Sequence, residues 1–310
     1  MKGVIKISVL VLFALFSISG YIYNQHPGTM LEAAKVASRV NAGLERNEVR
    51  VDDHTWVYLD GGKGEAILFL HGFGADKDLW GNFITMVSGS YRVILPDLPG
   101  FGESTRTGSC CYGVKKQAER LERFVTRIGL EKFHIFGSSM GGGIGAWYAA
   151  THPERVLSLA LVDTMGVAWD RDSYSIKRLK QDRVNLFLYD DAEEYDEFMS
   201  AIFYMPPDTP LHLKRFIAMQ NGKRKDFLDR TFRVLYEQRN VLAQCMPKIR
   251  NRTLVIWGAN DQVFDASCAK NAGRSVPGCC VNVIDNCGHL PYLEKPEETG
   301  NIYRKFLGSL

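Results

Sequence analysis

The chain contains the heptapeptide Phe-Gly-Ser-Ser-Met-Gly-Gly at residues 136–142, which places Ser139 in a Gly-x-Ser-x-Gly pattern between a strand-like and a helix-like stretch. A sharp strand-to-helix turn strains the backbone of such a serine, so the residues two before and two after it must be small. Gly137 and Gly141 meet this requirement. The turn directs the hydroxyl toward a helix N-terminus, whose free N–H groups favour developing negative charge. The pattern predicts a nucleophilic serine; taken alone, the pentapeptide also fits a glycine-rich helix start.

The rest of the chain alternates between short apolar runs and helix-compatible stretches. The runs lie at residues 55–59, 66–70, 91–95, 133–136, 156–162, 254–257 and 281–284. This alternation predicts an α/β fold with a mostly parallel central sheet flanked by helices. Residues 165–248 contain no convincing strand but several apolar groups at helical spacing, so we expect a helical cap inserted there, after the sixth strand. The core then comprises residues 49–164 and 249–310.

Composition narrows the classes of protein that fit. With 310 residues, 45% of them hydrophobic, the chain has enough apolar material for one large elaborated domain. Its 38 basic and 35 acidic residues are spread along the chain and leave a formal charge of only +3, which argues against a nucleic-acid partner. The seven cysteines lack zinc-type spacing, so we expect no structural metal, and they leave the question of disulfides open.

The N-terminus carries a targeting pattern. Lys2 and Lys6 precede an apolar run at residues 7–23, which predicts a signal-anchor or a cleaved signal peptide within residues 1–24. Aromatic residues continue the run beyond the small-x-small site at 17–19, which favours the anchor. The positive-inside rule then places the body on the non-cytoplasmic side of the membrane, or outside the cell if the segment is cleaved. Apolar residues at helical spacing predict a linker helix within residues 25–48.

The segment His71-Gly72-Phe73-Gly74 directly follows the apolar run at 66–70. Its glycines let the backbone curl so that the N–H groups of Phe73 and Met140 point at one position beside the Ser139 hydroxyl. Two such donors form an oxyanion hole, and a simple glycine turn is the alternative. His71 fits a role in organising this loop better than a role as a base.

Two further candidates follow late strands. Asp261 lies after the run at 254–257, where a carboxylate can orient an imidazole, and His289 follows the last predicted strand. Asp163, at the end of the run at 156–162, is the competing acid because a neighbouring strand tip could reach the same histidine. We therefore predict a catalytic set of Ser139, Asp261 and His289.

The order serine, aspartate, histidine is the one expected for an α/β-hydrolase. The chain resembles this superfamily from about Val49 to Leu310, and within it is similar to membrane-associated bacterial lipases and monoacylglycerol-lipase-like esterases. The segments that carry the resemblance are residues 71–77, 96–104, 137–142 and 288–291. They are specific for the superfamily and much less so for the substrate.

The resemblance implies hydrolysis of carboxylic esters through an acyl-enzyme on Ser139, without a cofactor. Apolar and aromatic residues of the predicted cap, together with the N-terminal segment, favour a lipid ester or monoacylglycerol as the substrate. One alternative is a carbon–carbon bond hydrolase of ring-fission products, in which an aromatic residue commonly follows the histidine; here Leu290 follows it. Another is a non-catalytic, membrane-tethered binding protein of the same fold. The sequence does not indicate an oligomeric state.

Overall fold

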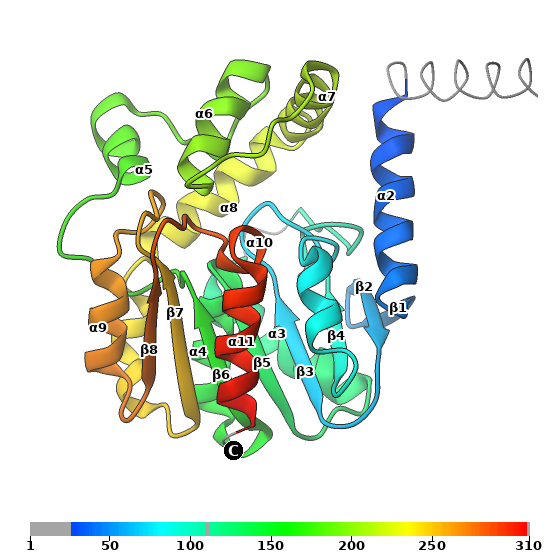
Figure 1. Ribbon diagram of the computed structural model, residues 1–310, viewed down its shortest axis with the longest axis vertical. Coiled ribbons are helices and arrows are strands. Elements are labelled where there is room, and N and C mark those ends of the chain that lie inside the picture. Colours follow the sequence, from blue (N-terminus) through cyan, green and yellow to red (C-terminus); the bar gives the residue numbers. More distant parts are fainter. Residues whose placement is uncertain (1–25, 109–111, 309–310) are drawn as a thin grey trace, which may run out of the picture.

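The computed structural model describes residues 26–108 and 112–308, which form an eight-stranded sheet under a helical cap (Figure 1). The strand order is β1-β2-β4-β3-β5-β6-β7-β8, with antiparallel pairing at β1–β2 and β2–β4 and parallel pairing elsewhere. The predicted α/β-hydrolase architecture with its mostly parallel sheet is therefore confirmed. The strands are β1 Leu44–Val51, β2 His54–Gly61, β3 Ala66–Leu70, β4 Arg92–Pro96, β5 Phe133–Ser138, β6 Val156–Val162, β7 Arg252–Gly258 and β8 Cys280–Ile284.

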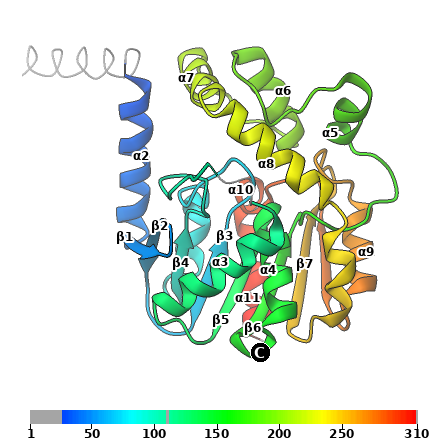
Figure 2. The same ribbon diagram turned by 180° about the vertical axis from the view of Figure 1, so that it is seen from behind.

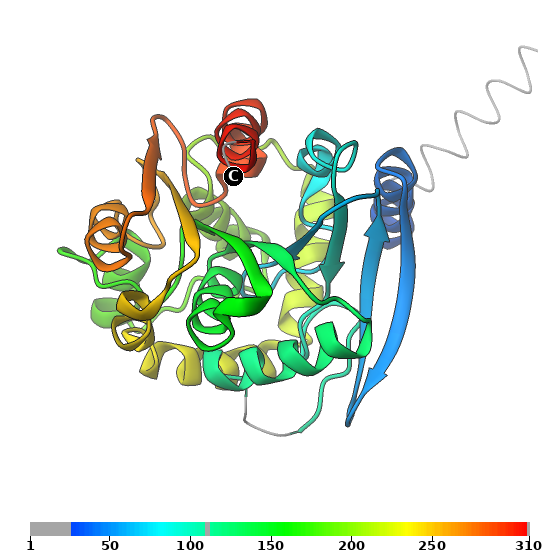
Figure 3. The same cartoon turned by 90° about the horizontal axis from the view of Figure 1, so that it is seen from below.

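Helices cover both faces of the sheet, which explains why its central strands are almost continuously apolar. One hydrophobic core lies on the face of η1, α10 and α11, and a second lies on the face of α3, α4 and α9. Figure 2 shows the second face, and Figure 3 shows the sheet between α11 and the α3–α4 pair. These helices are η1 Gly81–Met86, α3 Val114–Arg127, α4 Met140–Thr151, α9 Ser267–Ser275, α10 Pro291–Glu294 and α11 Pro296–Leu307; the short η2, Pro153–Arg155, leads into β6.

The cap lies over the carboxyl ends of the parallel strands (Figures 1 and 2). Its helices fall within the interval in which the sequence predicts a cap, and they follow β6, the sixth strand. Because the carboxyl ends of parallel strands gather the loops that follow them, the cap encloses the region where site residues are expected. The cap elements are α5 Tyr174–Lys177, the π-helical turn η3 Arg178–Asp182, α6 Ala192–Ile202, α7 Leu211–Gly222, α8 Lys225–Glu237, η4 Val241–Gln244 and η5 Met246–Lys248.

The prediction of a linker helix over residues 25–48 is only partly right. Helix α2, Pro27–Asn41, occupies the first part, but β1 begins at Leu44 and pairs antiparallel with β2 at the edge of the sheet. Arg39 of α2 makes a two-pronged ion pair with Asp78, with both N–O distances at 2.6 Å, and Lys35 lies 2.6 Å from Asp76. Helix α2 is thereby fixed to the loop that follows β3.

The predicted signal-anchor or signal peptide, residues 1–24, lies outside the described residues. Among residues 26–108 and 112–308, no helix has both the length and the apolar character needed to cross a membrane.

Candidate active site

Ser139 lies between the end of β5 and the first residue of α4 with a φ of 52° and a ψ of −117°, a strained conformation for a residue with a side chain. The turn is close-packed. A β-carbon on Gly141 would lie 2.0 Å from the carbonyl oxygen of Leu70, and one on Gly137 would lie 2.6 Å from that of Gly141. These two glycines are required by sterics, as the sequence pattern predicted.

The loop after β3 passes directly over Ser139. A β-carbon at Gly72 would lie 3.2 Å from the Ser139 Cβ and 3.7 Å from its Oγ. The next amide, that of Phe73, donates no hydrogen bond to any residue in the described ranges. Met140 is the first residue of α4, where the backbone N–H has no acceptor within the helix. Both predicted oxyanion donors are therefore available beside the serine.

His71 organises this loop. Its Nδ1 lies 2.8 Å from the carbonyl oxygen of Gly72, and its Nε2 accepts a hydrogen bond from the Leu98 amide at 3.0 Å. Complete burial lowers the pKa of this imidazole, which keeps it neutral. With both ring nitrogens engaged by the backbone, His71 holds two loops together rather than exchanging protons.

Asp261 and His289 lie together at the carboxyl edge of the sheet, after β7 and β8. His289 Nδ1 lies 2.9 Å from Asp261 Oδ2, and both residues are buried. The other carboxylate oxygen accepts the amides of Val263 at 2.7 Å and Phe264 at 3.1 Å, which fixes the carboxylate in the loop. Because Nδ1 faces a carboxylate, it carries the proton, and Nε2 is the free acceptor. This Nε2 has no hydrogen-bond partner among the described residues.

Asp163, the competing acid, lies at the end of β6 and does not bond the imidazole. Its Oδ1 accepts the Gly258 amide at 3.0 Å. One side-chain atom from each of Asp163, Asp261 and His289 lies within 4.8 Å of the others. Burial, reinforced by the neighbouring Asp261 carboxylate, raises the pKa of Asp163 well above its ordinary range. Within this cluster, His289 Nδ1 and both oxygens of Asp261 are already engaged in hydrogen bonds.

Two cavities meet at Ser139. The first, of about 60 Å³, lies toward Met140, Trp169 and Phe264, and its wall is largely apolar, with Ser175 and Asn185 among its polar residues. The second, of about 270 Å³, is lined by His289 and extends beneath α6 and α7. Both also include Phe73 and Phe187 in their walls. A ligand beside Ser139 thus has two directions in which to extend, and only the second passes the imidazole of His289.

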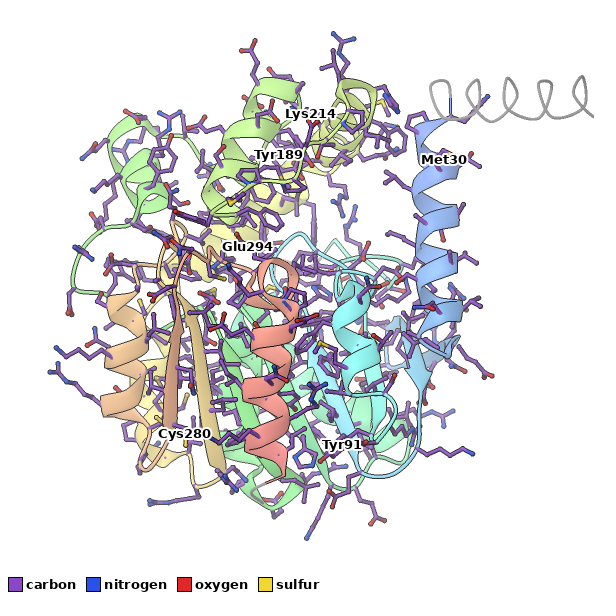
Figure 4. The ribbon with its side chains drawn as sticks, viewed as in Figure 1. Met30, Tyr91, Tyr189, Lys214, Cys280 and Glu294 are labelled. Atoms are coloured by element: carbon purple, nitrogen blue, oxygen red, sulfur yellow. The ribbon has the colours of Figure 1, made fainter. Side chains whose placement is uncertain are left out.

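One residue that shapes the site, Glu294, carries no sequence signal. Glu294, at the end of α10, accepts the Gly288 amide at 2.7 Å and the Tyr204 amide at 2.8 Å. It therefore joins the cap to the loop that carries His289; Figure 4 shows it below the cap. No motif marks this residue, because its partners are backbone amides brought together only by the tertiary fold. His134, in contrast, bonds Ser158 within the sheet, as its position in a strand suggests.

Comparisons with known proteins agree with this architecture. The family described as alpha/beta hydrolase fold matches residues 65–296. Monoacylglycerol lipase abhd6-A of Xenopus laevis is 31% identical over 80% of this chain and 77% of its own length. Lipase 1 of Psychrobacter immobilis is 31% identical over 81% of this chain and 80% of its own length.

Solved structures extend the likeness to the whole chain. The crystal structure of a membrane phospholipase A is 36% identical, with a TM-score of 0.88 and coverage of 98% of both chains. A meta-cleavage product hydrolase, at 21% identity and a TM-score of 0.74 over 85% of this chain and 98% of its own, shares the fold alone. Because the family match covers most of the chain, this protein belongs to the α/β-hydrolase family.

Proposed function

We propose that the protein is a serine hydrolase that cleaves carboxylic esters, with Ser139 as nucleophile, His289 as base and Asp261 as the acid that orients it. The observation that carries this proposal is the buried contact of 2.9 Å between His289 Nδ1 and Asp261 Oδ2, because it leaves Nε2 free in the cavity that Ser139 also lines.

The reaction follows from these positions. His289 Nε2 takes the Ser139 proton as the oxygen attacks the acyl carbonyl, and Asp261 stabilises the imidazolium that forms. The amides of Phe73 and Met140 stabilise the negative charge on the former carbonyl oxygen. His289 then protonates the leaving alcohol, and an acyl-enzyme remains on Ser139. Water, activated by the same imidazole, attacks this ester and releases the carboxylic acid.

A lipid ester, such as a monoacylglycerol, is the substrate class that the site supports best. The first cavity offers an apolar wall for an acyl chain, and burial of methylene groups contributes about 0.8 kcal/mol each. The names of the relatives, a monoacylglycerol lipase and a bacterial lipase, support the same class. Attachment to a membrane through residues 1–24, with the catalytic body on the non-cytoplasmic side, would hold the enzyme where such substrates concentrate.

A carbon–carbon bond hydrolase of ring-fission products is the second candidate, because the structure shares its fold with a meta-cleavage product hydrolase. A substrate series distinguishes the two candidates. We expect hydrolysis of p-nitrophenyl esters and monoacylglycerols and no turnover of ring-fission diketones. Turnover of the diketones alone would favour the second candidate.

Replacement of the nucleophile tests the mechanism. We expect Ser139→Ala to lower kcat for ester hydrolysis by at least about a thousandfold, because no acyl-enzyme can form. The matched control is Ser138→Ala at the neighbouring position, where the Oγ accepts a hydrogen bond from Tyr292 and takes no part in the proposed chemistry. Ordinary activity of Ser139→Ala would contradict the proposal.

A further inference from the structure

The position of His289 decides which cavity receives the leaving alcohol. After the acyl-enzyme forms, Nε2 must deliver its proton to the alcohol oxygen, so that oxygen lies within hydrogen-bond reach of the imidazole. His289 lines the second cavity and not the first. The acyl chain therefore extends into the first cavity, and the alcohol extends into the second.

The second cavity contains a buried amide with one unsatisfied atom. Asn221 lies in the last turn of α7, is 4% exposed and lines this cavity. Its Nδ2 donates to the carbonyl oxygen of Phe187 at 3.3 Å, which fixes the orientation of the amide. Its Oδ1 has no hydrogen-bond donor among the described residues. A buried carbonyl oxygen without a donor destabilises the fold, so its position in this cavity indicates a place where a ligand can supply the donor.

A second polar group accompanies this amide. Tyr189 lines the same cavity, and Figure 4 shows it within the cap. Burial raises the pKa of Tyr189 to about 12, and the nearby Asn221 amide moderates the rise. The phenol therefore remains protonated at neutral pH and can both donate and accept a hydrogen bond. Around these two groups the wall is largely apolar, including Leu79, Phe198, Met199 and Ile202.

From this arrangement we infer that the Asn221 carboxamide binds a free hydroxyl of the leaving alcohol, so that the enzyme prefers partial glycerides to simple alkyl esters. This inference rests on the proposed ester hydrolysis and adds the residue that selects its alcohol. Asn221 Oδ1 accepts the hydrogen bond from the substrate hydroxyl, and the Tyr189 phenol serves a second hydroxyl. An alcohol without hydroxyl groups leaves the Asn221 carbonyl unpaired, and enzymes discriminate against such substrates for this reason.

The first measurement uses the unmodified protein. We compare kcat/KM for four esters of one fatty acid in the same detergent micelles: those of glycerol, 1,2-propanediol, 1,3-propanediol and propanol. The free energy of one hydrogen bond corresponds to a preference of about tenfold. We therefore expect kcat/KM for the glycerol ester to exceed that for the propyl ester by at least that factor. The two diol esters identify which hydroxyl is bound. Equal values for all four esters would overturn the inference.

The second measurement assigns the preference to Asn221. We expect Asn221→Ala to lower the ratio of kcat/KM for the glycerol ester to that for the propyl ester by about tenfold while hydrolysis of the propyl ester persists. Gln220→Ala, the preceding residue of α7, lies outside this cavity and is the matched control. If Asn221 had a purely structural role, the substitution would lower kcat/KM for both esters equally and leave their ratio unchanged. That result would contradict the inference. Inactivity of the unmodified protein on every ester would instead reject the proposed function itself.

Discussion

Asp163 and Asp261 end neighbouring strands and lie close to the same imidazole, but only Asp261 bonds to it. Asp261 also accepts two backbone amides, an arrangement that suits a carboxylate. Asp163 is completely buried beside that carboxylate, and the resulting rise in its pKa favours the protonated form. Its φ of 42° lies in the left-handed region, which asparagine tolerates as well as aspartate does. The two residues are therefore expected to respond differently to the same substitution.

Asparagine scanning tests this difference. We expect Asp163→Asn to retain most of the ester hydrolysis, because the amide keeps the acceptor for Gly258 and resembles a protonated carboxyl group. Asp261→Asn removes the charge that orients and stabilises the imidazole, and a loss of about 10⁴-fold in kcat is expected. The measurement is kcat on a soluble p-nitrophenyl ester for both variants. The opposite pattern would make Asp163 the acid partner.

The residues of the site differ in how far the sequence could reveal them. Ser139 is predictable because its turn demands glycine at fixed positions nearby, a local steric requirement. Asp261 and His289 are predictable as candidates because each follows a strand, and parallel strands bring their carboxyl ends to one edge. Asn221 is different. Its proposed role in binding the alcohol depends on a cavity that exists only once the cap has folded over the core, and no local sequence pattern indicates that cavity.

At the level of elements, hydrogen bonds join the cap to the loop that carries His289. Glu294 of α10 accepts amides from both Gly288 and Tyr204, and the His289 amide donates to the carbonyl oxygen of Ile202 at 2.7 Å. Burial raises the pKa of Glu294 despite these hydrogen bonds. The end of α6 and the loop that carries His289 are thus held together, so the position of His289, the proposed base, depends on how the cap packs on the core.

Replacing Glu294 tests this coupling. In Glu294→Gln one acceptor oxygen becomes an amide donor that faces a backbone N–H. We expect the free energy of unfolding to fall by about 2 kcal/mol, a typical contribution of a hydrogen bond to a charged group. We also expect faster hydrogen exchange at the Gly288 and Tyr204 amides and a lower kcat, because the imidazole loses its fixed position. The control is Glu298→Gln, which changes an exposed carboxylate on α11. Unchanged exchange at both amides would show that Glu294 does not couple the cap to the loop that carries His289.

Strand β1 shows where sequence patterns fail at the level of elements. Its residues are rich in charge, and most of its side chains are exposed or half-buried. An edge strand with so little buried surface lacks the apolar alternation by which strands are predicted. Its antiparallel partner β2 supplies the hydrogen bonds that define it. The central strands were predicted because burial on both faces imposes an apolar run.

At the scale of the whole molecule, one charge network joins α2, β1 and the loops after β3 and β4. Glu103 is central to this network. Its carboxylate forms an ion pair with Lys77, accepts a hydrogen bond from Arg46 at 2.6 Å and lies 3.8 Å from Arg39. Partial burial opposes ionisation of Glu103, but the hydrogen bonds from Arg46 and Lys77 outweigh it and lower its pKa to about 2. Lys77 also belongs to the loop that carries Phe73, so the network links the edge of the sheet to the proposed oxyanion hole.

The pH dependence of stability tests the network. The pKa of Glu103 is depressed on folding, so its stabilising contribution is complete above its ordinary pKa of 4.5 and is lost as the pH falls toward about 2. We expect Glu103→Gln to lower the Tm at pH 7, and we expect the difference from the unmodified protein to shrink through this acidic interval, where the protonated glutamate resembles glutamine. Thermal unfolding followed by circular dichroism from pH 7 to strongly acidic pH provides the measurement. Glu45→Gln, an exposed carboxylate on β1 outside the network, controls for the loss of charge alone. A difference in Tm that stays constant across the interval would mean that Glu103 stabilises the fold through packing and not through its charge.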